Sequence, residues 1–275
     1  MKKYILSTIL AFFVCTTVNA GQHGGNKRTS NAAGFIAIKD RVILHKTNIE
    51  RYKAYEVMQL LKQTNIEFGK FVNIVKSTKN IDTRISEVSK GLNKIATTYE
   101  KIASYKKEVF TVRKSELRGI AETQMETEDN IEQIKKEKLR TEEKIENLRS
   151  NMYNEQDEYE IKKKKIEIRA LKIIAPALDA RIEIWEKFHI AQKTLESKLE
   201  VNGKKLDLLF FTLQMNAKIY RSASEVSQLR KTAVSALRVL NDAVNLQSVI
   251  KDLEKSWTDV NLVVEVIKNT EFVIE

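Results

Sequence analysis

The apolar positions of the chain recur at helical spacing, and the most regular run lies between Ile81 and Ile102. Four-residue and three-residue steps alternate through its members, which are Ile81, Ile85, Val88, Leu92, Ile95, Tyr99 and Ile102. This alternation places a narrow stripe along one side of an α-helix and is typical of a coiled-coil seam. The pattern therefore predicts a long helix that packs against another helix.

The same alternation resumes after a shift of one residue and continues toward residue 166. Its apolar members are Phe110, Leu117, Ile120, Ile131, Ile134, Ile145, Leu148, Met152, Tyr159 and Ile166. Polar residues occupy the remaining seam positions, namely Gln124, Thr127, Lys138, Thr141, Glu155 and Lys162. Polar seam residues weaken a coiled coil but fix its register.

Two arrangements explain this second run. One is a single very long helix, and the other is a hairpin that turns near Gly119 or within residues 150–154. The stretch contains no proline and no paired glycines, which favours two long helices. We expect the long coiled-coil part to cover about residues 81–168.

The regions on either side also read as helices. Residues from Phe35 to about Val75 predict a first helical region with a kink or short break near Asn65 and Gly69. Residues 77–80 read as a turn, with Asn80 as a candidate N-cap for the next helix.

Several positions after residue 168 predict helix boundaries. Pro176 is expected either to open a new helix or to kink the preceding one, and Gly203 is expected to end that helix. Residues 206–220 are the most apolar part of the chain after the leader and predict a central buried helix. Residues 222–225 carry a capping-box spacing, which predicts that the last helix begins there. The fold class is therefore all-α, an elongated helical bundle with a long coiled-coil hairpin.

The first twenty residues predict an export signal. Lys2 and Lys3 precede a short apolar run, and residues 18–20 (VNA) offer a signal-peptidase site before Gly21. We expect a cleaved signal peptide at 1–20, a flexible arm at 21–34 and a helical domain at 35–275. The only cysteine, Cys15, follows bulky residues rather than the small one that lipidation requires, so the exported chain is expected to be neither lipidated nor disulfide-bonded.

The net charge of the chain bears on which partners are expected and does not alter the predicted fold. The formal net charge of +11 falls to +9 when Lys2 and Lys3 are removed with the signal peptide, which contains no acidic residue. A basic run at Lys162, Lys163, Lys164 and Lys165 is a candidate contact for an anionic surface. No nucleic-acid reading motif is present, so nucleic acid is not an expected partner.

Candidate chemistry is sparse. Glu186 and His189 share the Glu-x-x-His spacing of bundle metal sites, but such sites need a second copy of the motif, and no glutamate lies three residues before His45. Cleavage before Gly21 would create an N-terminal Gly21-Gln22-His23 whose nitrogens suit square-planar copper or nickel. No nucleophile elbow or phosphate-binding glycine loop is present. We therefore expect no enzyme activity, no cofactor, no structural metal and no small-molecule substrate.

The opening MKKYILSTILAFFVCTTVNA, followed by helices rich in Lys, Ile and Asn and nearly without proline, resembles the exported helical antigens of spirochaetes. Many proteins of that group are lipidated, and the Phe12-Phe13-Val14 that precedes Cys15 departs from that pattern. The resemblance implies a surface or periplasmic helical protein that meets host components. The expected function is protein binding, or self-association through the coiled coil. The alternatives are a periplasmic holdase chaperone and a membrane-active helical toxin.

Overall fold

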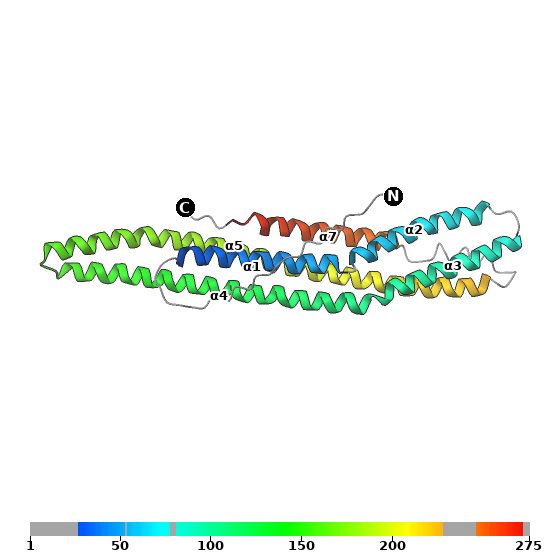
Figure 1. Ribbon diagram of the computed structural model, residues 1–275, viewed down its shortest axis with the longest axis horizontal. Helices are drawn as coiled ribbons and strands as arrows, with labels where there is room; N and C mark the ends of the chain where they lie inside the picture. Colours follow the sequence, from blue (N-terminus) through cyan, green and yellow to red (C-terminus); the bar gives the residue numbers. More distant parts are fainter. Residues whose placement is uncertain (1–26, 53, 78–80, 228–245, 272–275) are drawn as a thin grey trace, which may run out of the picture.

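The computed structural model describes residues 27–52, 54–77, 81–227 and 246–271, and every structural statement below concerns these residues (Figure 1). They form the helices α1 (Lys27–Arg51), α2 (Ala54–Ser77), α3 (Ile81–Ser104), α4 (Lys106–Tyr153), α5 (Glu158–Ser227) and α7 (Leu246–Asn269). No strand occurs among the described residues. The predicted all-α helical bundle is confirmed.

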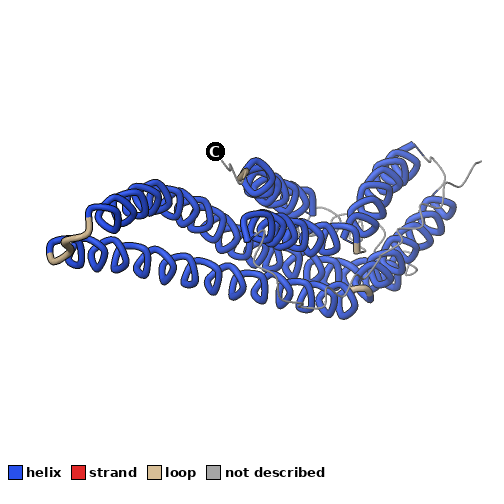
Figure 2. Tube along the Cα trace, turned by 60° about the vertical axis from the view of Figure 1, so that its left-hand side comes forward, coloured by secondary structure: helices blue, strands red, loops and turns tan. Residues whose placement is uncertain are grey.

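The long helix α5 runs the length of an elongated molecule, with α3 and α4 antiparallel to it (Figure 1). Only Tyr105 separates α3 from α4, and its backbone stays in the right-handed helical region (φ −72°, ψ −11°). α3 and α4 therefore form an almost continuous rod along α5. Figures 1 and 2 show α1 and α7 lying along the middle of this pair and α2 lying beside α3 at one end.

Two apolar cores fill the bundle, and α5 contributes to both. The first includes Leu61 of α2, Leu92 of α3, Phe210 of α5 and Leu253 of α7. The second joins Phe35 of α1, Ile120 of α4, Trp185 of α5 and Val260 of α7. In the second core the Phe35 and Trp185 rings meet edge to face, with their centroids 4.9 Å apart. Because α5 supplies side chains to both, it positions the other helices.

The seam between Ile81 and Ile102 packs within the chain. Val88, Leu92, Ile95, Tyr99 and Ile102 are all buried. The ring of Tyr99 lies 5.8 Å from the ring of Tyr220 on α5. The partner of this seam is therefore a helix of the same chain, α5.

The second seam is confirmed along α4 and wrong beyond it. Ile120, Ile131, Ile134 and Ile145 are buried, and so are the polar seam residues Gln124 and Thr127. The chain then turns at residues 154–157, so Tyr159 and Ile166 lie on a returning helix and are exposed. Of the two predicted turn positions, the one within residues 150–154 is nearly correct.

Gly119, the other predicted turn position, is buried within α4, where α1 comes close. A Cβ at this position would lie 2.3 Å from Cε1 of His45. His45 is itself held by Glu116, whose Oε2 lies 2.7 Å from its Nδ1. The glycine therefore gives the imidazole room and does not mark a turn.

The N-terminal helices also differ from the prediction. α1 begins at Lys27, so residues 27–34 are helical rather than a flexible arm, while residues 21–26 lie outside the described residues. α2 runs without a break past Asn65 and Gly69, and the first helical region is divided after Arg51 instead. A single helical glycine costs only about 1 kcal/mol, which packing on α3 offsets. The predicted turn at 78–80 lies outside the described residues.

The predicted helix start at Pro176, helix end at Gly203 and helix start at residues 222–225 are wrong, because α5 is unbroken from Glu158 to Ser227. The alternative of a kink at Pro176 stays a prediction. Pro176 lies on the exposed side of α5, where water can satisfy the carbonyl that the proline leaves without a donor. Gly203 is buried inside the helix rather than at its end. Residues 222–225 likewise continue α5 and do not cap a new helix. The predicted start of the last helix falls mainly on residues 228–245, which lie outside the described residues.

The predicted burial of residues 206–220 is correct for one face only. Leu206, Leu209 and Phe210 are fully buried in the first core. Leu208 and Phe211, by contrast, are 52% and 56% exposed. The segment is therefore the central part of a packed helix with one apolar side toward solvent.

The two glycines Gly69 and Gly119 give opposite expectations for substitution by alanine. Gly69→Ala should raise the free energy of unfolding by about 0.5–1 kcal/mol, because nothing lies within 4 Å of the added Cβ and the helix gains propensity. Gly119→Ala should lower it by about 1–3 kcal/mol, because the His45 ring must move. Urea unfolding followed by circular dichroism measures both. A Gly119→Ala protein as stable as the wild type would contradict the close approach of α1.

Candidate functional site

One end of the molecule is a two-helix projection. α4 and α5 continue beyond the ends of α1 and α7 and are joined by a short turn (Figure 1, left). We call residues 137–177, with the turn, the distal hairpin. Because a pair of helices buries little apolar surface, the hairpin depends on the contacts along its inner face.

The inner face of the hairpin holds its two helices together. Ile145 of α4 and Ile168 of α5 are buried between them. Ion pairs flank this seam: Lys144–Glu167 at 2.6 Å, Lys138–Asp179 at 2.7 Å and Lys164–Glu155 at 2.8 Å. Two of these pairs join α4 to α5 and the third joins the turn to α5, so the pairs fix the register of the hairpin.

The opposite face of α5 carries a second seam that no described helix covers. Tyr159, Ile166 and Ile173 are 72%, 67% and 76% exposed. With the exposed residues between and after them they repeat the alternation of four and three, and we call this set the outer stripe: Tyr159, Lys163, Ile166, Ala170, Ile173, Ala177 and Ala180. Its members lie two positions, or about 200° around the helix, from the inner seam. The stripe ends at the half-buried Ile184, where the second core begins.

The outer face of α4 shows that an apolar exterior is not general to the hairpin. The corresponding positions of α4 are exposed and polar, although Leu139 beside them is 56% exposed: Gln133, Lys136, Arg140, Glu143, Asn147 and Ser150. The two helices of the hairpin therefore differ in what they present to solvent. A mainly apolar stripe, interrupted only by Lys163, is the kind of surface that can mark a docking site.

The turn at the tip is fixed by two carboxylates. Asp157 caps α5, because its Oδ1 accepts a hydrogen bond from the backbone N–H of Tyr159 at 2.8 Å. Glu155 binds Lys164, and the hydrogen bond from that ammonium holds the pKa of Glu155 below its ordinary value. Tyr153, at the end of α4, is 90% exposed. An ordered tip thus presents Tyr153 and Tyr159 to solvent.

The predicted basic patch Lys162–Lys165 is divided among different faces. Lys162 lies 2.9 Å from Glu158, Lys163 lies 3.7 Å from Glu160, and Lys164 reaches across to Glu155. Lys165 is exposed. Three of the four lysines therefore have an acidic neighbour, and contact with an anionic surface stays a prediction.

The predicted metal motif does not converge. Glu186 accepts a hydrogen bond from Lys135 at 2.7 Å, whereas Nε2 of His189 lies 3.0 Å from Glu128. Within the described ranges, no group of three His, Cys, Asp or Glu side chains could hold a metal ion. His23 lies outside these ranges, so copper or nickel binding by Gly21-Gln22-His23 stays a prediction.

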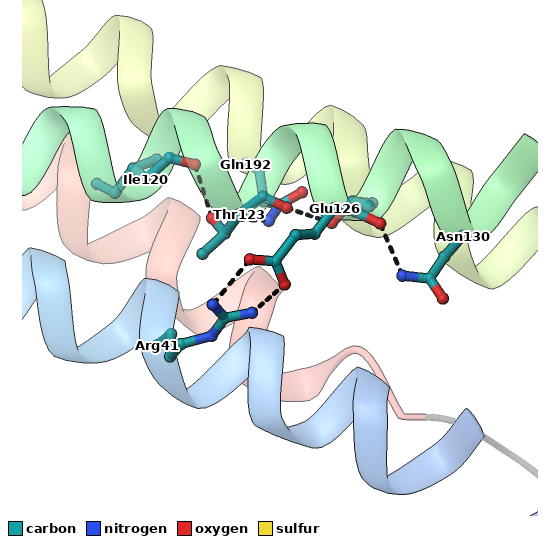
Figure 3. Close-up of polar contacts among 7 residues, drawn as sticks. Arg41, Ile120, Thr123, Glu126, Asn130 and Gln192 are labelled. Carbon is teal, nitrogen blue, oxygen red and sulfur yellow. Dashed lines mark hydrogen bonds and ion pairs between the residues drawn. The ribbon is translucent and has the colours of Figure 1, made fainter. Parts of the chain in front are cut away.

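A polar layer between α1, α4 and α5 sets the register of the body (Figure 3). Thr123 donates to the carbonyl of Ile120 at 2.6 Å and accepts a hydrogen bond from the buried Gln192 at 3.3 Å. Beside it, the Arg41 guanidinium binds both carboxylate oxygens of Glu126. This hydrogen bond holds the pKa of Glu126 below and that of Arg41 above their ordinary values. The layer is structural, because it ties α1 and α5 to α4.

A buried cation lies nearer the other end of α4. Arg113 is 4% exposed, donates to Oδ1 of Asn202 at 3.2 Å and occupies the space left by Gly203. Burial lowers its pKa to about 10, so it stays charged at neutral pH. The adjoining groove of about 620 Å³ is lined by side chains of both charges, among them Lys114 and Glu200. This lining combines no nucleophile with a base in the arrangement that acyl or phosphoryl transfer needs.

Comparison with known proteins identifies no relative: no family model, no curated protein and no solved structure matches the chain. Of the helices described, none is long and apolar enough to cross a membrane.

Sequence reasoning missed the outer stripe. It assigned Tyr159 and Ile166 to the buried seam and did not single out Ala170, Ile173 or Ala177. The signal was present, because residues 159–184 carry two 4-3 patterns offset by two positions, one facing α4 and one facing away. Only knowledge of where the chain turns separates the two.

The Arg41–Glu126 pair predicts a specific acid dependence. Because the carboxyl pKa is lowered in the folded chain, its contribution to stability is complete above the ordinary glutamate pKa and is lost as the pH falls through the lowered value. Glu126→Gln should therefore lower the free energy of unfolding at pH 7 by less than about 1 kcal/mol, since both side chains are 45% exposed. The difference from wild type should vanish in acid.

Urea unfolding at several pH values measures this difference. Glu143→Gln, on the exposed outer face of α4, is the matched control and should change stability little at any pH. A difference between Glu126→Gln and wild type that persists unchanged in acid would show that the pair does not act through its charge.

Proposed function

We propose that the chain is an exported, non-enzymatic binding protein that presents the distal hairpin to protein partners. The observation that carries this proposal is the outer stripe. Its isoleucines Ile166 and Ile173 are more than half exposed on a helix whose other face is packed, and the equivalent face of α4 is polar. Two desolvated isoleucines and a tyrosine are enough to anchor a small interface.

The geometry of the hairpin supports a role in contact rather than in catalysis. The exposed apolar residues lie along a rod that projects from the body, so a partner can approach without displacing α1 or α7 (Figure 2). The alternating spacing of the stripe fits another helix better than a flat surface, because each residue can enter a hole between four side chains of a facing helix. The favoured partner is therefore a protein with an amphipathic helical face.

The proposal includes export, for which the support is the pattern of residues 1–20. The alternative of a membrane-active toxin is not supported by the positions of the apolar side chains that such a toxin would insert. Leu209 and Phe210 are fully buried in the first core, so inserting them would require the body to open.

Binding of the mature chain, residues 21–275, to a panel of folded extracellular proteins tests the proposal. This chain keeps every described helix. The double variant Ile166→Lys/Ile173→Lys should weaken any specific binding by more than about tenfold, because each substitution removes a buried aliphatic contact and places a charge in the interface. Surface plasmon resonance measures the affinities.

The matched control is Gln133→Lys/Asn147→Lys, which adds the same charge to the polar outer face of α4 and should leave binding unchanged. Circular dichroism should show the same melting for both variants. Equal binding by the outer-stripe variant and wild type would reject the hairpin as the binding element. Suppression of the aggregation of an unfolded client, lost in the outer-stripe variant alone, would instead place the protein among holdase chaperones.

A further inference from the structure

The outer stripe is complementary in side-chain size and charge to a second copy of itself that runs in the opposite direction. We propose that two chains associate through it, with the α5 helices of their distal hairpins antiparallel about a two-fold axis. This inference rests on the proposed function, since it names the partner of the same surface.

Large residues of the stripe face small ones when the two copies are aligned in this way. Placing Ile166 opposite Ala177 of the second copy also places Ile173 opposite Ala170 and Lys163 opposite Ala180. Tyr159 then reaches the half-buried Ile184. Ile166, Ile173 and Lys163 thus each face an alanine, which lets the helices approach closely, and only Tyr159 faces a large residue, at the end of the contact. A parallel pair would instead bring Lys163 against its own copy, a repulsive contact.

The residues that flank the stripe have complementary charges in the same alignment. Lys162 comes beside Glu183 of the second copy, and Glu160 comes beside Arg181. Within one chain, Lys162 pairs with Glu158 and Glu183 pairs with Lys187. The pairs of Lys162 and Glu183 are exposed and therefore weak, so these two residues can exchange them for contacts across the interface. Arg181 is only 22% exposed and already lies 3.8 Å from Glu137.

The segment of residues 228–245 is too short to reach the stripe. Residues 228–245 are anchored at Ser227, the far end of α5 from the hairpin (Figure 1). Ala180 is about 70 Å away along the helix, whereas 18 residues that go out and return reach only about 31 Å. The stripe from Tyr159 to Ile184 is about 38 Å long.

The area of the stripe predicts a reversible dimer. A contact about 38 Å long and one helix wide covers roughly 400 Å² on each copy, or about 800 Å² in total. Standard stable interfaces bury about 1,200–2,000 Å². We therefore expect dimerisation that depends on concentration across the micromolar range and is not permanent.

Sedimentation equilibrium of the mature chain is the first test. The wild type should move from a monomer mass to a dimer mass as concentration rises. Ile166→Lys/Ile173→Lys should remain a monomer, while the control Gln133→Lys/Asn147→Lys should dimerise like the wild type. A wild type that is monomeric at every concentration, or a dimer that is unaffected by the outer-stripe variant, would overturn the proposal.

A charge exchange tests the antiparallel orientation. Lys162→Glu and Glu183→Lys should each weaken dimerisation about two- to fivefold, the usual effect of an exposed ion pair. The double variant should restore it. These residues are about 31 Å apart on the same helix, so they cannot compensate each other within one chain. Absence of restoration would reject this register.

Single cysteine substitutions test the antiparallel orientation independently. They are possible because the only cysteine of the sequence, Cys15, lies outside the mature chain. Ala170→Cys lies near the two-fold axis and should form a disulfide-linked dimer on oxidation. Ala180→Cys lies about 26 Å along the axis from its copy and should not. Crosslinking of both would indicate a parallel pair. If the wild type is monomeric yet the outer-stripe variant loses binding to another protein, the dimer is wrong and the proposed function stands.

Discussion

The packing of α5 against the rod formed by α3 and α4 is the contact on which the structure depends. α3, α4 and α5 each have an apolar seam that is too narrow to form a core alone. α5 runs antiparallel to α3 and α4, and its seam packs against theirs. Trp185 and Phe210 of α5 are fully buried in different cores, so one helix anchors α1 at one place and α2 at another. In proteins most of the stability of a helix comes from tertiary packing of this kind.

The sequence was sufficient to predict the fold class and the two main seams. A strict alternation such as that from Val88 to Ile102 has one physical solution, a partner helix, and the structure supplies it. The polar seam residues Gln124 and Thr127 were also recognised correctly as buried members of the register. Periodicity identifies which side of a helix is covered, because that depends only on helical geometry.

Helix ends were predicted poorly, since they depend on contacts made far along the chain. Gly203 reads locally as a helix stop, yet it is an interior residue that makes space for Arg113 of another helix. Pro176 reads as a boundary, yet an exposed position in a long supported helix tolerates it. The outer stripe was missed for the same reason: until the turn at 154–157 is located, Ile166 fits the buried seam as well as the exposed one.

The outer faces of the two hairpin helices differ in polarity, and this difference is the main reason to assign a role to the outer stripe. If the hairpin served only as a spacer, both outer faces could be polar, as the outer face of α4 is from Gln133 to Ser150. Keeping Ile166 and Ile173 in water weakens solubility and adds nothing to the stability of the hairpin, whose inner seam lies on the opposite side. The coiled-coil spacing of the stripe, its small residues beside large ones and the opposite charges at its two ends therefore support the proposed contact with a second helix.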